Sequence, residues 1–332
     1  MKEYIIKLEP RSSFEVDLHS DTIFGAICWS IRTLFGEALL LKILEEFKVK
    51  PPFLISSAFP CRLDKEEYYI PKPFLKPLEH DELNIYLTGY KDSREIYHSS
   101  KKALIEIITK YKKFKKLRWL KLSYVQSLNK IDEKNLFRDY LNNIIKEPVF
   151  AEQGAVQKNS LDRLTGSTSG SGNTFYQEEK YFKSKWGLYF LVRTDRFKEE
   201  LWPVLRLLED SGIGSNARTG KNWFHIKFEE KPIYGNEEGD SFITLSRYIK
   251  NEHLRENCFY KLVSVRSKVE SREEFAGENV WKNKVTYFSE GSMLYPEEKK
   301  DFYGGIFPVK EIAGKTIYQY GYAYPVWISR EV

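Results

Sequence analysis

The stretch GIGSNARTGKN, residues 212–222, combines pieces of two well-known phosphate-binding loops. Its first six residues fit the G-x-G-x-x-G/A pattern of dinucleotide-binding folds, which needs a strand before the glycines and a helix after them. The order here is reversed. A helical pattern with Pro203 near its start ends at Gly212, whereas residues 223–228 alternate as in a strand. The loop therefore does not belong to a dinucleotide-binding fold.

The end of the loop, Gly220-Lys221, resembles the end of a Walker loop, but the spacing excludes that motif. A Walker loop has four residues between its first glycine and its Gly-Lys pair, and then a Ser or Thr that binds magnesium. Five residues separate Gly214 from Gly220, and Asn222 replaces the hydroxyl residue. The chain therefore contains no P-loop at this position.

A Gly-rich loop between a helix and a strand can still bind phosphates by another route. Glycines let the backbone approach a chain of phosphates closely, and successive N–H groups form an anion-binding nest. The candidate phosphate-binding residues are Gly212, Gly214, Ser215, Asn216, Arg218, Thr219, Gly220 and Lys221. The alternative is an ordinary surface connector, and a single Gly-rich loop does not separate the two interpretations.

The order of the expected elements favours an α+β fold. Residues 4–8 form a predicted strand, and residues 21–34 a predicted amphipathic helix that Asp21 caps, with an apolar face of Ile23, Ala26, Ile27, Ile31 and Leu34. A strand near residues 154–163 and an apolar strand at 185–193 follow. With the helix, loop and strand around residue 212 they give β-α-β-β-α-β, the ferredoxin-like order of RNA-recognition folds. Residues 50–150 are then an insertion after the first helix.

The composition limits the classes of protein that the chain can belong to. Of its 332 residues, 42% are hydrophobic and 30% charged, which indicates a globular protein. We expect no membrane span and no signal peptide, because the sequence contains no run of about 18 apolar residues. The isolated residues Cys28, Cys61 and Cys258 favour a cytoplasmic protein without disulfides or a zinc site. A net charge of +6 permits nucleic-acid binding without proving it.

Seven motifs in register resemble a known family. They are LHSDTIFGAICWSIRTLFG, PPFLISSAFP, YIPKPFLKP, SLDRLTGSTSGSGNTFYQEEKYF, the Gly-rich loop, SEGSML and YQYGYAYPVWI. Together they are similar to the fourth subunits of the Csm complex, the type III-A CRISPR effector, which belong to the RAMP superfamily. Ser215 and Asn222 stand where glycine is common in that family, and asparagine is the non-glycine residue that adopts positive φ most easily.

The resemblance implies a fold and a function. It implies two ferredoxin-like domains, residues 1–232 with the insertion and residues 233–332 in degenerate form. It also implies a non-catalytic subunit for antiviral defence that binds the 5′ handle of CRISPR RNA. Such a subunit links the large polymerase/nuclease subunit to the backbone RAMP subunit. No cofactor, metal or membrane contact is expected.

Residues 158–182 form an expected hairpin with a Gly/Ser/Thr-rich tip. One interpretation is a surface hairpin without a binding role. The resemblance implies instead a thumb that kinks the RNA. In that case Lys158, Arg163, Thr165 and Lys180 meet phosphates, while Phe175 or Tyr176 is a wedge against a base.

The start of the first helix supplies three further candidates. Free N–H groups at a helix N-terminus attract phosphate, so His19, Ser20 and the more distant Arg32 are candidate RNA contacts. His19 also carries the main alternative function, a metal-independent RAMP endoribonuclease in which this histidine is the general base. A structural or RNA-contacting histidine is the interpretation that we favour.

Two other motifs are less specific. His80-Asp81 resembles the dipeptide of metal-dependent phosphohydrolases, but such sites need further ligands, and we interpret it as a surface loop. Residues 101–122 are rich in lysine, and a predicted helix there presents Leu104, Ile105, Ile108, Tyr111 and Leu117 on one face. The lysine-rich surface of this helix is either exposed to solvent without a binding role or a docking surface for the partner subunit or RNA.

Overall fold

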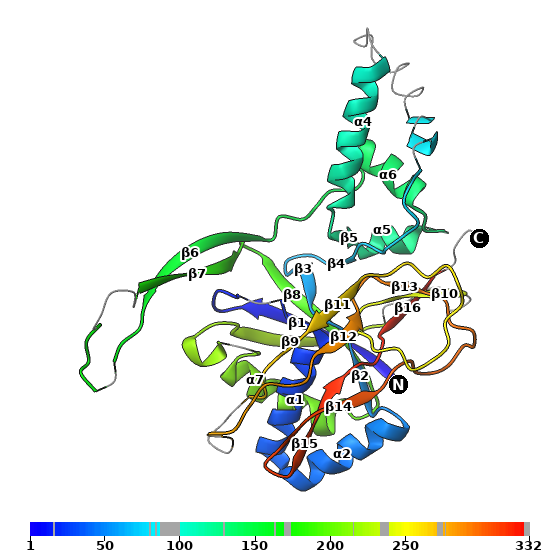
Figure 1. Cartoon of the computed structure of the whole chain (residues 1–332). Helices are drawn as coiled ribbons and strands as arrows, with labels where there is room; N and C mark the ends of the chain where they lie inside the picture. Colours follow the sequence, from blue (N-terminus) through cyan, green and yellow to red (C-terminus); the bar gives the residue numbers. More distant parts are fainter. Residues whose placement is uncertain are drawn as a thin grey trace. The chain divides into compact units, whose positions relative to one another are not determined.

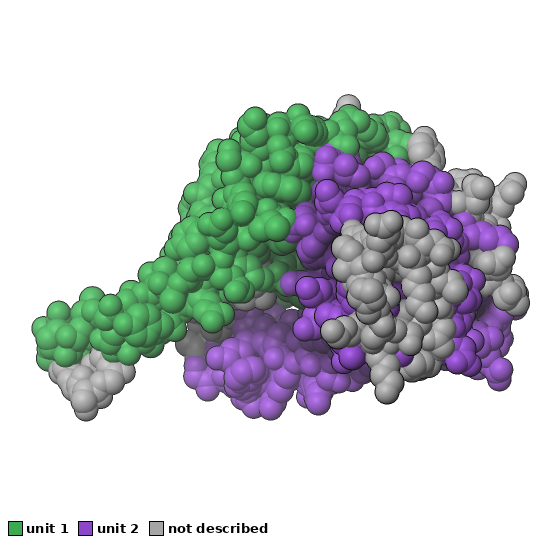
Figure 2. Space-filling view, turned by 90° about the horizontal axis from the view of Figure 1, so that it is seen from above, with its two compact units in different colours: residues 1–66, 149–232 green, residues 67–148, 233–332 purple. Residues whose placement is uncertain are grey.

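The computed structural model divides into two compact units. It describes residues 1–15, 17–79, 81–83, 85–86, 100–128, 130–162, 164–168, 174–214, 216–232, 239–270, 275 and 277–328. Unit 1 comprises residues 1–66 and 149–232, and unit 2 comprises residues 67–148 and 233–332 (Figure 2). No helix among the described residues is long and apolar enough to cross a membrane.

Unit 1 is built on an antiparallel sheet in the order β3-β8-β1-β9, with β2 also paired to β8 (Figure 1). The register runs from Lys2 opposite Thr194 to Leu8 opposite Leu188 between β1 and β8. The strands of this sheet are β1 (Lys2–Pro10), β2 (Phe53–Ile55), β3 (Phe59–Arg62), β8 (Trp186–Thr194) and β9 (Phe224–Glu230). Because most residues of β1 and β8 are buried, the centre of this sheet lies in the core of unit 1.

Three helices accompany the sheet: α1 (Ser20–Phe35), α2 (Glu37–Val49) and α7 (Trp202–Ser211), the last preceded by a π-helical turn at Phe197–Leu201. Helices α1 and α7 contact each other, and they bury apolar stripes that include Ile23, Ile27 and Ile31 on α1 and Val204 and Leu208 on α7. Pro203 lies in the first turn of α7, where a missing N–H costs nothing. The sequence predicts both helices, but α1 begins at Ser20 after His19 instead of being capped by Asp21, and Leu34 is exposed.

The position of one predicted strand is wrong. The strand near residues 154–163 is not part of the sheet, because β6 (Ala151–Asn159) pairs with β7 (Thr174–Phe182) as a two-stranded hairpin. Its place beside β8 is taken by β2 and β3. Residues 53–62, which we expected in the insertion, therefore belong to the sheet of unit 1.

Unit 2 has a helical part and a β-rich part. The helical part contains β4 (Glu67–Pro71), α4 (Ser100–Lys115), β5 (Trp119–Lys121), α5 (Leu122–Ser127) and α6 (Glu133–Leu141). Aromatic rings form its core, with Phe137 5.1 Å from Tyr111 and 5.4 Å from Phe114 between ring centroids. The face of α4 that the sequence predicts is shifted, because Ala103, Ile107, Tyr111 and Phe114 are buried and Ile105 is exposed.

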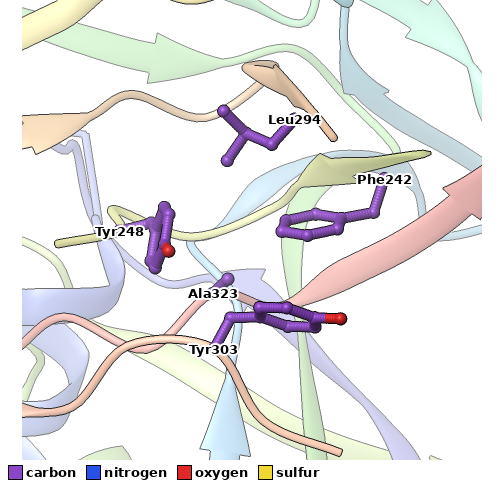
Figure 3. Close-up of a cluster of buried hydrophobic side chains, with 5 residues drawn as sticks. All are labelled: Phe242, Tyr248, Leu294, Tyr303 and Ala323. Carbon is purple, nitrogen blue, oxygen red and sulfur yellow. The ribbon is translucent and has the colours of Figure 1, made fainter. Parts of the chain in front are cut away.

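The β-rich part of unit 2 has a small sheet and two hairpins. The sheet has the order β13-β10-β16, and β11 pairs with β12 and β14 with β15. The bounds are β10 (Ser241–Thr244), β11 (Leu262–Val265), β12 (Val285–Phe288), β13 (Met293–Leu294), β14 (Ile306–Ile312), β15 (Lys315–Tyr320) and β16 (Pro325–Ile328). Its core is the cluster Phe242, Tyr248, Leu294, Tyr303 and Ala323 (Figure 3). The described residues 239–328 contain no α-helix, so a ferredoxin-like second domain stays a prediction.

Candidate nucleic-acid interface

The Gly-rich loop begins where α7 ends. The N–H of Gly212 donates to Leu208 O over 2.9 Å, so the helix ends at Gly212 as the sequence predicts, and Gly212 has φ +77°. A Cβ on Gly212 would lie 2.8 Å from Cβ of Ala217 and 3.0 Å from the ring of Trp223. Both the backbone angle and the space therefore require glycine here.

The second half of the loop is held by its own hydrogen bonds. The N–H groups of Thr219 and Lys221 donate to Asn216 O over 2.9 and 3.2 Å, and a 3-10 turn spans Ala217–Thr219. Asn222 donates to Ser13 O over 3.0 Å, and the N–H of Ile213 donates to Asn222 O over the same distance. Asn222 has φ +56°, which explains how asparagine replaces a glycine at this position.

The first half of the loop contains backbone N–H groups that are available to bind a ligand. Within the described part of the chain, the N–H groups of Gly214, Asn216 and Ala217 make no hydrogen bond. Gly214 has φ +86°, and a Cβ there would lie 3.2 Å from Thr22 Cγ2 at the start of α1. The N–H groups of Gly214, Asn216 and Ala217 can supply an anion nest.

A buried carboxylate joins this loop to the base of the β6–β7 hairpin. Glu179 on β7 is 1% exposed and forms an ion pair with Lys221, and it accepts from Ser13 Oγ over 2.8 Å and from Tyr181 Oη over 3.1 Å. Lys158 on β6 is 3.5 Å from its other oxygen. We call Glu179, Lys221, Ser13, Tyr181 and Lys158 the Glu179 cluster.

The Glu179 cluster stabilises the ionised form of its central carboxylate. Burial by itself raises the pKa of Glu179, but hydrogen bonds from Lys221, Ser13 and Tyr181 and the charge of Lys221 lower this pKa to about 2. The side chain of Lys221 is only 13% exposed and also donates to Ser13 Oγ over 3.0 Å. Its ammonium group is therefore committed to Glu179 and Ser13.

The hairpin is anchored at one end and exposed along the rest. Its nine paired positions run from Ala151 opposite Phe182 to Asn159 opposite Thr174, and it projects from the rest of unit 1 (Figure 2). At the base, Phe14 exchanges two backbone hydrogen bonds with Lys180 and stacks on Phe182 at 4.3 Å between centroids. Most side chains beyond this base are exposed.

The two aromatic candidates of the hairpin lie on opposite faces. Side chains alternate along a strand, so Phe175 shares the face of Glu179, and Tyr176 lies on the other face. Phe175 is 48% exposed and Tyr176 72%. Phe175 therefore lies on the face that Glu179 ties to the Gly-rich loop, about 13 Å along the strand from Glu179.

Comparison with protein families identifies these features as parts of one fold. The sequence profile of the RAMP superfamily matches residues 11–224, which include α1, the hairpin and the Gly-rich loop. The chain belongs to the RAMP superfamily. The resemblance that the seven motifs carry is thus confirmed.

Individual relatives cover nearly the whole chain. The CRISPR system Cms protein Csm4 of Thermococcus onnurineus (strain NA1) is 27% identical over 328 residues, which are 98% of this chain and 96% of that protein. A chain in the crystal structure of a Csm1–Csm4 cassette in complex with cA4 matches with a TM-score of 0.61 and 22% identity, over 100% of both chains. A chain in a Csm3–Csm4 subcomplex of the type III-A CRISPR-Cas interference complex matches with a TM-score of 0.54 and 19% identity, over 96% of this chain and 99% of that one. The two solved structures share the fold of this RAMP protein.

The candidates at the start of α1 occupy different environments. His19 is the residue before α1, and its carbonyl accepts from Thr22 and Ile23 over 3.0 Å. Ser20 is fully buried, and its N–H donates to Ser57 Oγ over 2.9 Å. Arg32 forms an ion pair of 3.1 Å with Glu37. Ser20 has no exposed atoms to offer a phosphate, so we leave it out of the proposed contacts.

Several other candidate residues already make contacts within the chain. Lys158 belongs to the Glu179 cluster, and Lys180 lies 3.0 Å from Asp17. Thr165 is exposed, and its hydroxyl lies 3.0 Å from Ser167 Oγ. Arg163, Ser215 and the side chain of Arg218 lie outside the described residues, and so does His80 of the His80-Asp81 pair.

Sequence reasoning missed the central residue of the site. Glu179 and Tyr181 lie inside the quoted hairpin motif and Ser13 lies outside all seven motifs, but an acidic residue in a hairpin that is expected to bind RNA does not suggest a contact. One signal was present: period-2 alternation places Phe175, Glu179 and Tyr181 on one face of β7.

Proposed function

We propose that this RAMP protein is a non-catalytic subunit of a type III-A CRISPR effector that binds the 5′ handle of CRISPR RNA. Membership of the RAMP superfamily and the relative named Csm4 support an effector subunit. The matched Csm1–Csm4 and Csm3–Csm4 structures support two protein partners, a large polymerase/nuclease subunit and a backbone RAMP subunit. The proposal includes a domain boundary near residue 232.

The observation that carries RNA binding is the connection between the loop and the hairpin. Lys221 belongs to the second half of the loop, and Glu179 lies near the base of the hairpin. Their buried ion pair holds the N–H groups of the loop and the exposed ring of Phe175 at a fixed distance from each other within unit 1. A single-stranded RNA needs these two kinds of contact, donors for phosphates and a ring for a base.

We assign different roles to these residues within the proposed contact. The N–H groups of Gly214, Asn216 and Ala217 cradle a phosphate, since they are free to donate. Phe175 is the wedge, because it lies on the face of the hairpin that is tied to the loop. Lys221 and Lys158 act indirectly by holding Glu179, and their charges are largely compensated.

Two substitutions at Gly214 test this proposal. Gly214→Ala introduces only strain, because φ is +86° and Thr22 is close, whereas Gly214→Asp adds a negative charge beside the nest. We expect Gly214→Asp to lose CRISPR RNA from the purified effector complex while Gly214→Ala retains most of it. Ala38→Asp, on the exposed surface of α2, controls for the added charge. Equal RNA retention in the Asp and Ala variants would show that no phosphate lies at the nest.

A further inference from the structure

A second surface in unit 2 has the composition of a nucleic-acid contact. It is the ribbon formed by residues 260–268 and 280–288, which contain β11 and β12. These two segments hold Lys261, Arg266, Lys268, Lys282 and Lys284 and contain no Asp or Glu. The whole chain has a net charge of +6, so a large share of its positive excess lies on this ribbon.

Exposed aromatic rings lie among these cations. Tyr260 and Trp281 are 50% and 42% exposed, and they stand toward opposite ends of the ribbon. Lys268 and Trp281 form an isolated bridge beyond β11, so their side chains point to the same side. The ammonium of Lys268 lies 4.7 Å and the guanidinium of Arg266 5.4 Å from the centroid of the Trp281 ring.

The charges of the ribbon are available to a ligand. Within the described part of the chain, none of Lys261, Arg266, Lys268 and Lys284 forms an ion pair, and all four are exposed. The fifth cation, Lys282, donates to Gln319 Oε1 over 3.0 Å. Four uncompensated cations without a neighbouring acid in either segment attract a polyanion.

The ribbon is anchored in the core of unit 2. Tyr287 of β12 is fully buried, and Phe288 exchanges two backbone hydrogen bonds with Tyr248. Tyr248 belongs to the buried cluster drawn in Figure 3, against which Phe288 also packs. Because the ribbon is fixed to this core, its exposed rings are held in place before any ligand binds, and this lowers the entropy cost of binding.

We propose that the exposed side of this ribbon is a binding surface for single-stranded RNA. Bases stack on Tyr260 and on the cation-backed Trp281, and Arg266, Lys268 and Lys284 neutralise the phosphates between them. The rows from residue 260 to residue 268 span about 25 Å, which several nucleotides can follow. An acidic protein segment would use the cations but would leave both rings without a stacking partner.

A hydroxyl pair on the ribbon favours RNA over DNA. Ser264 and Thr286 lie opposite each other on β11 and β12, with their hydroxyl oxygens 2.8 Å apart and exposed. The pair lies between the two aromatic ends and can donate to or accept from a ribose 2′-hydroxyl, the group that distinguishes RNA from DNA. The residues of this surface belong to unit 2, whereas those of the loop and the hairpin belong to unit 1.

The test is the affinity of the full chain for an oligouridine of about 15 nucleotides, measured by fluorescence anisotropy. It is run in a Gly214→Asp background, so that the proposed loop site does not contribute. We expect Trp281→Ala to weaken binding about tenfold or more. The double variant Lys268→Gln/Lys284→Gln is expected to lower the slope of log affinity against log salt by about 1.4, since each phosphate contact on a single strand contributes about 0.7.

Matched controls lie on unit 1. Phe35→Ala removes a ring of similar exposure, 40%, and Lys42→Gln/Lys50→Gln removes two exposed lysines from α2 and its C-terminal end. Neither should change the affinity or the salt slope. The charge variants keep the Trp281 ring itself, so they remain informative if Trp281→Ala does not fold. Unchanged binding in the ribbon variants would overturn the proposal, and an oligothymidylate bound as tightly as oligouridine would overturn the assignment to RNA.

Discussion

Replacing Lys221 by methionine should destabilise the chain far more than a surface lysine replacement does. Methionine keeps most of the apolar stem of the lysine and removes only the charge that faces Glu179. Glu179 is 1% exposed in the parent chain, and among the described residues the variant leaves it two hydroxyl donors and Lys158, 3.5 Å away, as a counter-charge. Removing one partner of a buried pair leaves an uncompensated charge, which costs about 3 kcal/mol of unfolding free energy.

The same substitution should have a smaller effect at low pH. The pKa of Glu179 in the folded chain is about 2, below its ordinary value of 4.5, so this group stabilises the fold above about pH 4.5 and loses that contribution as the pH falls toward 2. Without Lys221 the pKa of Glu179 rises. At pH 4 the variant can protonate Glu179 at little cost, and the difference from the parent chain shrinks.

Urea unfolding of the two chains at pH 7 and pH 4 measures both effects. Lys227→Met is the control, because Lys227 on β9 pairs with Glu9 over 2.9 Å while both side chains are largely exposed. Such a surface pair contributes about 1 kcal/mol or less. Glu179→Gln combined with Lys221→Met should recover part of the loss, since the buried charge is gone. If Lys221→Met and Lys227→Met were equally mild at pH 7, the Glu179 cluster would not hold the hairpin to the loop.

Other predictions concern RNA contact and chemistry. Phe175→Ala should weaken binding of handle RNA about tenfold, and Tyr176→Ala should weaken it less, because Phe175 and not Tyr176 shares a face with Glu179. Equal losses of affinity in a filter-binding assay would contradict this assignment. Neither change should shift the urea midpoint much, because both rings are about half exposed or more. Purified chain incubated with precursor CRISPR RNA and EDTA should give no specific product; a product that disappears in His19→Ala would establish the endoribonuclease instead. Lys72→Met in unit 2 removes the charge that compensates Glu133, its buried partner at 3.3 Å. This variant should have a lower melting temperature and an unchanged RNA affinity, which parallel melting and binding curves can check.

Local signals explain which parts of the fold could be predicted from the sequence. The helix before residue 212 and the strand after it follow from apolar spacing, and Gly212 and Asn222 adopt the positive φ that their residue types allow. The strand at residues 154–163 was placed wrongly, because an exposed hairpin strand alternates in the same way as a sheet strand. The short buried strands β2 and β3 lack such alternation, so they were missed.

The site shows a similar division. The Gly-rich loop and the hairpin were recognisable as motifs, but their connection depends on Glu179 and Lys221, which lie 42 residues apart and meet only in the folded chain. The role of Lys221 changes with that contact, from an expected phosphate ligand to the partner of a buried acid. Sequence alone could not show that Ser20 is buried behind Ser57, because capping and phosphate binding need the same residue types.

Photocrosslinking of handle RNA to the assembled complex tests the central claim most directly. CRISPR RNA that carries 4-thiouridine in its 5′ handle is irradiated, and the crosslinked peptides of this chain are identified by mass spectrometry. The account predicts crosslinks in residues 212–221 and at Phe175 or its neighbours on β7, and their loss at the loop in Gly214→Asp. Crosslinks confined to other segments, with none in the loop or the hairpin, would contradict it.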